Sequence, residues 1–194
     1  MSTTTHRMTR RQAVKLAWQV QAQLRPGCER IEVAGSVRRK TPDVGDLEFV
    51  IVPKREAGLF GDASPGESLL DRVLGDLVDE GRLRRGERDG ERQKQFVLAR
   101  SGVKLDLFIV TPATWGVQLA IRTGPSNFST ALVMPRYRGG YLDDDLQISE
   151  GRAWRIPSYG AGIVDGTSAV ALDTPEESDF LALAGGWVEP EDRR

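Results

Sequence analysis

The most constraining feature of the sequence is an apolar, largely β-branched run at Leu47–Val52 that contains a single acid, Glu48. Such a run, bounded here by Asp46 and Pro53, is typical of a central strand that is buried in a sheet. A carboxylate inside a buried strand has a large desolvation cost unless something compensates its charge. The chain is therefore expected to form a core sheet that carries an acidic site.

Helices and further strands are predicted on both sides of this run. Thr9 and Gln12 form a capping-box pattern, and apolar residues then recur at helical spacing until Arg25-Pro26-Gly27. The remaining expectations for this half are a strand at Ile31–Ala34, a helix from Leu69 to Val78 that ends at Gly81, a charged connection at Arg82–Arg92, and a hairpin of Gln95–Ala99 with Val103–Val110 joined by Ser101-Gly102.

Thr111-Pro112 indicates a boundary, beyond which a second, smaller α+β unit is expected. The expected features there are a helix at Trp115–Arg122, a break at Gly124-Pro125, a helix or turn at Phe128–Val133, and a capped helix start at Thr174, Pro175 and Glu177 that leads to an end at Gly185-Gly186. All four tryptophans, Trp18, Trp115, Trp154 and Trp187, are expected in packed positions.

Composition restricts the chemistry. One cysteine, Cys28, excludes an intrachain disulfide and a cysteine-rich zinc site, and the one histidine, His6, makes histidine-dependent catalysis improbable. Carboxylates, arginines, lysines and hydroxyls remain, which favours magnesium sites built from oxygen ligands. No stretch approaches the roughly eighteen apolar residues of a membrane span and no signal peptide is evident, so a compact cytoplasmic protein is expected.

Charge is distributed unevenly although the net charge is only −1. Residues 1–40 carry nine Lys or Arg and two acids, a balance of +7, which leaves −8 for the rest of the chain. Any surface that faces phosphate is therefore expected near the start of the chain. The alternative is that these are solvated surface charges without a partner.

Three acids are expected to meet on the sheet. Side chains alternate across a strand, so Asp46 and Glu48 point to the same face, and Asp106 on a neighbouring strand can complete the group. Three carboxylates on one face repel one another unless cations lie among them. Two magnesium ions held in this way can activate a hydroxyl nucleophile and stabilise a leaving pyrophosphate. Gly35-Ser36 would allow close approach of a triphosphate, and Arg39 would neutralise its charge.

Three motifs follow one another along the chain: Gly35-Ser36-Val37-Arg38-Arg39, Gly45-Asp46-Leu47-Glu48 and Lys104-Leu105-Asp106. In this order and spacing, they resemble the motifs of the nucleotidyltransferase superfamily, and in particular those of the family X DNA polymerases of the DNA polymerase beta type. The resemblance covers nearly the whole chain and ends on the segment from Leu172 to Arg193, which is similar to the closing part of the family's thumb. It implies an α+β fold: a nucleotidyltransferase palm, with a mixed sheet and helices on one side, followed by a small α+β thumb. The implied boundaries are a flexible tail at 1–8, the palm at 9–112 and the thumb at 113–194.

Site residues follow from the resemblance. Asp46, Glu48 and Asp106 match the three catalytic acids that hold two Mg²⁺ ions, for which Mn²⁺ can substitute. The matching nucleotide-binding positions are Arg7, Gly35, Ser36, Arg39, Gly45, Thr123 and Gly124, and Lys104 matches a position beside the primer. Thr123-Gly124-Pro125 is similar to a turn that carries a cis peptide in the family, and proline at 125 would make a cis bond easier.

The sequence also departs from the family pattern. Glu48 replaces the usual Asp, Ile121 and Arg122 replace an aromatic pair at the sugar edge, and Ser126 and Ser129 stand at base-contact positions. The stretch before Arg7 is too short for a lyase domain or helix-hairpin-helix fingers, so no lyase activity and a weaker grip on DNA are expected.

The resulting prediction is a monomeric DNA-directed DNA polymerase that adds dNMP to a primer 3′ hydroxyl on primer-template or gapped DNA, in gap filling or repair synthesis. One alternative is a template-independent nucleotidyltransferase acting on RNA, protein or a small molecule. Another is an inactive palm that serves as a binding module, which the altered residue Glu48 would favour.

Overall fold

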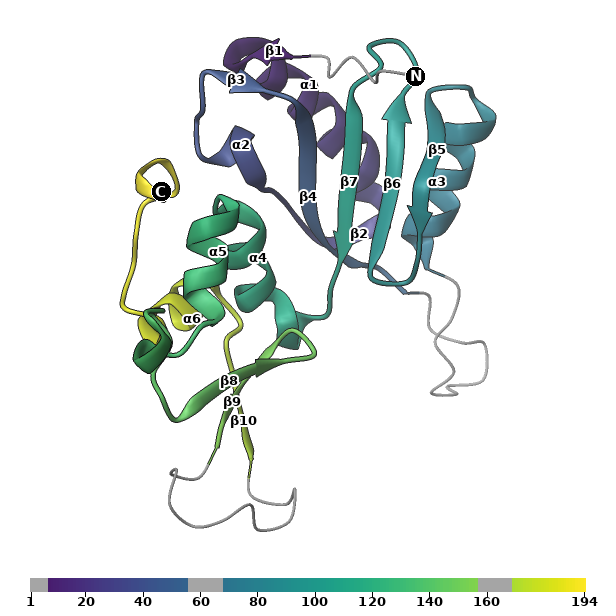
Figure 1. Ribbon diagram of the computed structural model, residues 1–194. Coiled ribbons are helices and arrows are strands. Elements are labelled where there is room, and N and C mark those ends of the chain that lie inside the picture. The colour runs from purple at the N-terminus through teal and green to yellow at the C-terminus, as the bar shows by residue number, and fades with distance from the viewer. Residues whose placement is uncertain (1–6, 56–67, 157–168) are drawn as a thin grey trace, which may run out of the picture. The chain divides into compact units, whose positions relative to one another are not determined.

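The computed structural model of the chain describes residues 7–55, 68–156 and 169–194 (Figure 1). Its internal contacts divide it into two compact units, Met1–Thr111 and Pro112–Arg194. The protein is α+β, and each unit has its own hydrophobic core. In the described parts of the chain, no helix combines the length and the apolar composition that a membrane span requires.

A mixed five-stranded sheet forms the centre of the first unit. Its strands are β2 (Cys28–Val33), β4 (Asp46–Pro53), β7 (Lys104–Ile109), β6 (Gln93–Leu98) and β5 (Leu83–Asp89), in that spatial order. Only the central pair, β4 with β7, is parallel. The expected run at Leu47–Val52 is thus confirmed as a central strand, flanked by neighbours on both edges.

Two helices cover one face of this sheet, α1 (Arg10–Leu24) and α3 (Leu69–Asp79), seen behind it in Figure 1. The capping box that starts α1 is confirmed, because the Thr9 hydroxyl accepts from the Gln12 N–H while the Gln12 side chain accepts from the Thr9 N–H. Shorter elements complete the unit: β1 (Met8–Thr9), the 3₁₀ turn η1 (Arg25–Gly27), the one-turn helix α2 (Gly35–Arg38) and β3 (Asp43–Val44).

Alternation along the central strands separates core from site. Leu47, Phe49 and Ile51 of β4 are fully buried and join the cluster that includes the apolar residues of α1 and α3. Leu105 and Leu107 of β7 belong to the same cluster. Asp46, Glu48 and Asp106 occupy the intervening positions and therefore lie on the face turned away from these helices.

Two expectations for the first unit need correction. Arg82–Arg92 is not a connection: it contains β5, which pairs with β6 at the edge of the sheet. Only Leu83 of β5 is buried, so an exposed edge strand of this kind carries no apolar alternation that a sequence could reveal. The tail expected at 1–8 ends earlier, because Met8 is buried and pairs with Val44; residues 1–6 lie outside the described part.

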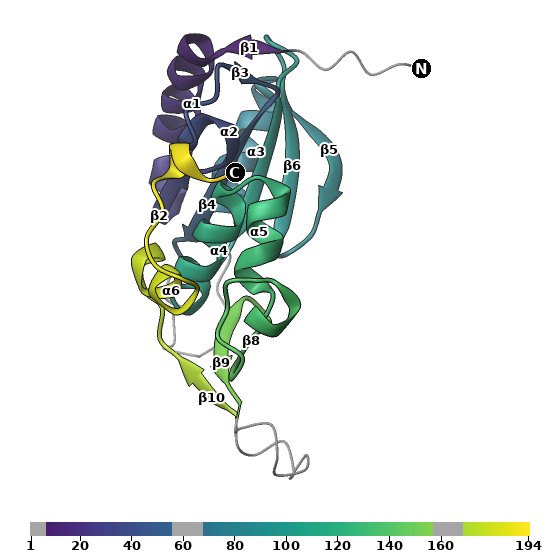
Figure 2. The same cartoon turned by 60° about the vertical axis from the view of Figure 1, so that its left-hand side comes forward.

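The second unit joins three helices to a small antiparallel sheet (Figure 2). Its core contains Phe180, Leu181, Leu132 and Leu142, all fully buried. The helices are α4 (Trp115–Thr123), α5 (Ser126–Val133) and α6 (Glu177–Leu183); the strands, in spatial order, are β10 (Val170–Leu172), β9 (Arg152–Arg155) and β8 (Leu146–Ser149); and the 3₁₀ turns are η2 (Pro112–Thr114), η3 (Arg136–Arg138) and η4 (Pro190–Asp192).

The start of α6 differs from expectation. Glu176, not Thr174, is the cap: its side chain and that of Asp179 satisfy each other's backbone N–H groups. Thr174 is held in the preceding extended segment, where its carbonyl accepts from the Gly116 N–H at 3.1 Å. A Cβ at Gly116 would collide with the carbonyl oxygens of Thr174 and Glu176, so a glycine there permits this close approach of backbones.

The Gly124-Pro125 bond and two of the tryptophans differ from expectation. No peptide bond in the described residues is cis, so the Gly124-Pro125 bond is trans, the isomer preferred even before proline. Trp115 is buried as expected, but Trp18 is 73% exposed and Trp187 is 49% exposed. Trp18 lies on the solvent side of α1, opposite the apolar stripe that faces the sheet.

Candidate acidic site on the central strands

The parallel pairing of β4 with β7 brings the predicted acids together. Glu48 lies directly beside Asp106 in the register, and Asp46 lies beside Lys104. Since the period of a strand is two, all four side chains emerge on the same face of the sheet. The acids are partly exposed, whereas their sequence neighbours Leu47, Phe49, Leu105 and Leu107 are buried.

The charges of this group influence one another. The pKa of Asp46 is raised above its ordinary value of 3.8, first by burial and then by the nearby Asp106 carboxylate. Lys104 and Arg39 act in the opposite direction and lower that pKa. Asp46 therefore lies within electrostatic reach of Asp106, Lys104 and Arg39, three other residues that the sequence predicted for the site. Within the described residues, no three acid, histidine or cysteine side chains are already arranged as a metal-binding group.

The Gly35-Ser36 turn lies against the second acid. The Ala34 N–H donates to the Glu48 carbonyl at 2.8 Å, which joins the start of α2 to β4. Gly35 has φ +58°, and a Cβ on it would run into the Glu48 carboxylate. Glycine is therefore needed there both for its backbone conformation and for the space it leaves.

The hydroxyl of Ser36 is buried and has no hydrogen-bond partner within the parts of the chain that are described. An unsatisfied buried hydroxyl has a free-energy cost, which a ligand could offset. Arg39 follows at the end of α2, where its backbone N–H donates to the Gly35 carbonyl at 3.0 Å. Gly45 precedes β4. Met8 pairs with Val44 in the antiparallel β1–β3 register, and the next residues along these two segments are the exposed Arg7 and Gly45.

Thr123 and Gly124 belong to the second unit rather than to the unit that holds the acids. Thr123 is fully buried and Gly124 caps the end of α4. A Cβ at Gly124 would meet the Phe128 ring at 2.7 Å, and the nearby Ser129 hydroxyl donates to the Ile121 carbonyl at 2.6 Å. Packing at the α4–α5 turn thus accounts for these residues without a ligand.

Two glutamines that sequence reasoning missed belong to the acidic face. The side-chain amides of Gln93 and Gln95 on β6 both donate to Oδ1 of Asp106, at 3.2 and 3.1 Å. Their spacing of two residues indicates a shared strand face, but only the β6–β7 register, which places Gln95 beside Asp106, reveals what that face meets.

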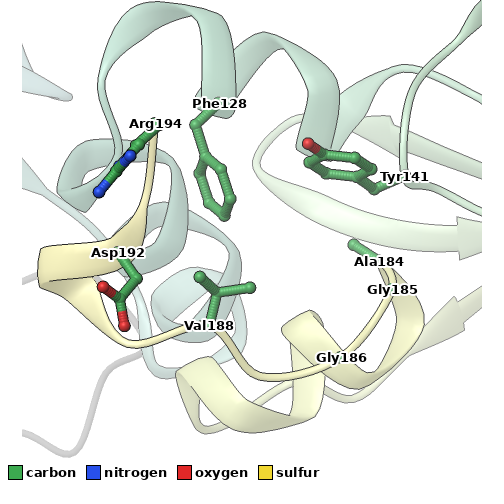
Figure 3. A pocket seen from close by; sticks show the side chains of 8 residues that line it. All are labelled: Phe128, Tyr141, Ala184, Gly185, Gly186, Val188, Asp192 and Arg194. Carbon is green, nitrogen blue, oxygen red and sulfur yellow. The ribbon is translucent and has the colours of Figure 1, made fainter.

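Two surface cavities lie elsewhere. A cavity of about 290 Å³ in the second unit is shown in Figure 3 and is lined by Phe128, Tyr141, Ala184, Gly185, Gly186, Val188, Asp192 and Arg194. A larger one, of about 780 Å³, lies between α1 and the Gly81-Arg82 and Arg100-Ser101 turns. Neither of these two cavities is lined by a predicted site residue.

Comparison with known proteins adds no family assignment, since no protein-family model and no curated protein matches the chain.

Proposed function

We propose that the chain is a metal-dependent nucleotidyltransferase that adds dNMP from a dNTP to the 3′ hydroxyl of a DNA primer, in the manner of the family X DNA polymerases that its motifs resemble. The observation that carries this proposal is the register of β4 with β7, which sets Glu48 beside Asp106 on the face that also bears Asp46. Three acids on one sheet face are unfavourable without cations. Burial and, after it, the nearby Asp106 carboxylate raise the pKa of Asp46.

Asp46, Glu48 and Asp106 are the residues that would hold Mg²⁺, because magnesium prefers carboxylate oxygens. When bound, a pair of such ions supplies activation of the attacking hydroxyl and stabilisation of the leaving pyrophosphate. The fit of the residues is one of chemistry and strand position: the carboxylates share a face but do not already form a binding group. Binding therefore requires side-chain rotation, in particular of Glu48, which lies against Gly35.

The remaining residues have roles in binding. Arg39, close enough to lower the pKa of Asp46, would neutralise a triphosphate, and the buried Ser36 hydroxyl would donate to one of its oxygens. Lys104, beside Asp46, would contact the primer. Arg7 would add to the triphosphate site, and the second unit would act as the thumb.

Primer extension on a duplex with a one-nucleotide gap tests the proposal, with each dNTP supplied singly and Mg²⁺ or Mn²⁺ present. We expect extension by the templated nucleotide only, and a loss of at least about 100-fold in Asp106→Asn, which keeps the shape but removes the charge of a metal ligand. Asp76→Asn, an exposed position on α3, is the matched control and should retain full activity.

An unprimed single strand and an RNA primer serve as parallel substrates. If no DNA is extended although a nucleotide raises the melting temperature in the presence of Mg²⁺, the polymerase proposal is wrong and a template-independent transferase replaces it. If neither extension nor Mg²⁺-dependent nucleotide binding occurs, the acids are not a catalytic site.

A further inference from the structure

The edge hairpin of β5 and β6 reaches the acidic face through its side chains. Gln93 and Gln95 alternate with Phe96 and Lys94, and Phe96 belongs to the core on the opposite face. Both amides extend to one atom, Oδ1 of Asp106. The third acid is thus held by two donors from a strand that contains no predicted site residue.

The orientation of both amides is fixed by β5. The Arg88 guanidinium donates to Oε1 of Gln93 at 2.8 Å, and the Glu87 backbone N–H lies 3.4 Å from Oε1 of Gln95. Arginine and backbone N–H groups can only donate, and an ionised carboxylate can only accept. Each glutamine therefore satisfies both neighbours in one orientation only, with Oε1 toward β5 and Nε2 toward Asp106.

The backbone of β5 is shaped for this contact. Its pairing with β6 shifts between Arg85 and Asp89, as in a β-bulge, and the shift falls on the segment that presents Glu87 and Arg88. Gly86 within it lies so close to Gln95 that an added Cβ would be 2.8 Å from the Gln95 Cγ. A side chain at 86 would push Gln95 away, so the glycine preserves the approach.

We propose that Gln93 and Gln95 are positioning residues for Asp106, and that β5 holds them in place through Arg88 and the Glu87 N–H. Since both amides engage Oδ1, they fix the rotation of the carboxylate and leave Oδ2 for a metal ion. This inference rests on the proposed function, in which Asp106 holds the catalytic metal.

The first test needs no metal and no activity. In ¹H–¹⁵N spectra, the side-chain amide signals of Gln93 and Gln95, assigned through Gln→Met variants, should shift in Asp106→Leu, whereas the signal of Gln23 on α1 should not move. Amide signals that do not respond to Asp106→Leu would show that the contacts are absent in solution and overturn the inference.

The second test measures metal binding and catalysis in Gln93→Met and Gln95→Met. Methionine keeps the length and most of the volume of glutamine but cannot donate a hydrogen bond, so a purely packing role would tolerate it. We expect Mn²⁺ affinity, measured by titration, to fall about 10-fold in each variant, with a matching fall in kcat at subsaturating metal and an unchanged KM for dNTP. Gln23→Met, partly buried on α1, is the matched control.

The outcomes separate the two proposals. The positioning role is overturned if both Met variants bind Mn²⁺ and extend the primer as well as the unaltered protein does, with unchanged melting temperatures. That result would leave the proposed function intact. If the unaltered protein neither binds Mn²⁺ nor extends a primer, the proposed function fails and the positioning role fails with it, even where the amide signals respond to Asp106→Leu.

Discussion

At the scale of single residues, Asp46 combines a proposed function with a cost in stability. Burial and Asp106 raise its pKa, so between its ordinary value of 3.8 and the raised value the native state binds a proton that the unfolded state has released. The free energy of unfolding therefore falls as pH rises through that window and stays lower above it. Asp46→Asn removes this penalty, and we expect it to melt at a higher temperature than the unaltered protein at pH 7 in metal-free buffer.

The comparison is made by thermal melting from pH 3 to pH 8 with a chelator present. The advantage of Asp46→Asn should shrink as pH falls and disappear below about pH 3.8, where the aspartate is protonated in both states. Added Mg²⁺ should stabilise the unaltered protein only. A lower melting temperature for Asp46→Asn at pH 7 would mean that the ionised carboxylate makes a net favourable contribution, contrary to the pKa argument.

The shared face of Asp46, Glu48 and Asp106 could be predicted from sequence, because side chains alternate along a strand and both segments have the pattern of buried strands. Gln93 and Gln95 could not, since a glutamine on a half-exposed strand is ordinary and gains its meaning only from the register of β6 with β7. The closeness of Gly35 to Glu48 likewise depends on a turn joining two strands, which spacing alone does not specify.

At the scale of elements, a buried ion pair attaches the C-terminal segment to α6. The Arg193 guanidinium donates to Oε1 of Glu177 at 2.6 Å and through Nε and Nη2 to the Val188 carbonyl, and its side chain has no exposed surface. Removing one partner leaves a buried charge uncompensated, so we expect Arg193→Met to lower the free energy of unfolding by about 3 kcal/mol.

Chemical denaturation of the second unit, followed by tryptophan fluorescence, gives this free energy. Arg194→Met, one residue further along and exposed, is the matched control and should change stability little. Adding Glu177→Gln to Arg193→Met should restore part of the loss, because the unpaired charge is then gone. A single variant as stable as the unaltered protein would argue against a structural role for the pair.

Elements whose own residues contain a capping box or a glycine turn were predicted well. Elements that form because of contacts with other parts of the chain were not. The capping box of α1 and the hairpin turn at Gly102, with φ +70°, follow from local chemistry. The strand β5 exists because β6 offers it a partner, and Leu83 is its only buried side chain. The cap of α6 moved to Glu176 because the Thr174 carbonyl is engaged by Gly116 of another helix.

At the scale of the whole molecule, the division at Thr111 and Pro112 predicts that the first unit can fold by itself. Among the residues that the structure describes, its core cluster joins α1, α3 and all five strands of the central sheet and includes no residue beyond Ile109, and the cluster of the second unit is smaller. Because a larger buried apolar core supports a larger free energy of unfolding, a fragment ending at Thr111 should be the more stable of the two halves.

We expect the Met1–Thr111 fragment to unfold cooperatively on heating and to give a dispersed ¹H–¹⁵N spectrum. Within this fragment, Phe49→Ala should lower the free energy of unfolding by about 3 kcal/mol, because it leaves a cavity at a fully buried position. Trp18→Ala, at an exposed position on α1, controls for the loss of an aromatic ring without burial. A fragment that lacks a cooperative transition would show that the first core depends on the second unit. A folded fragment that still binds Mn²⁺ would place the metal ligands within the first unit.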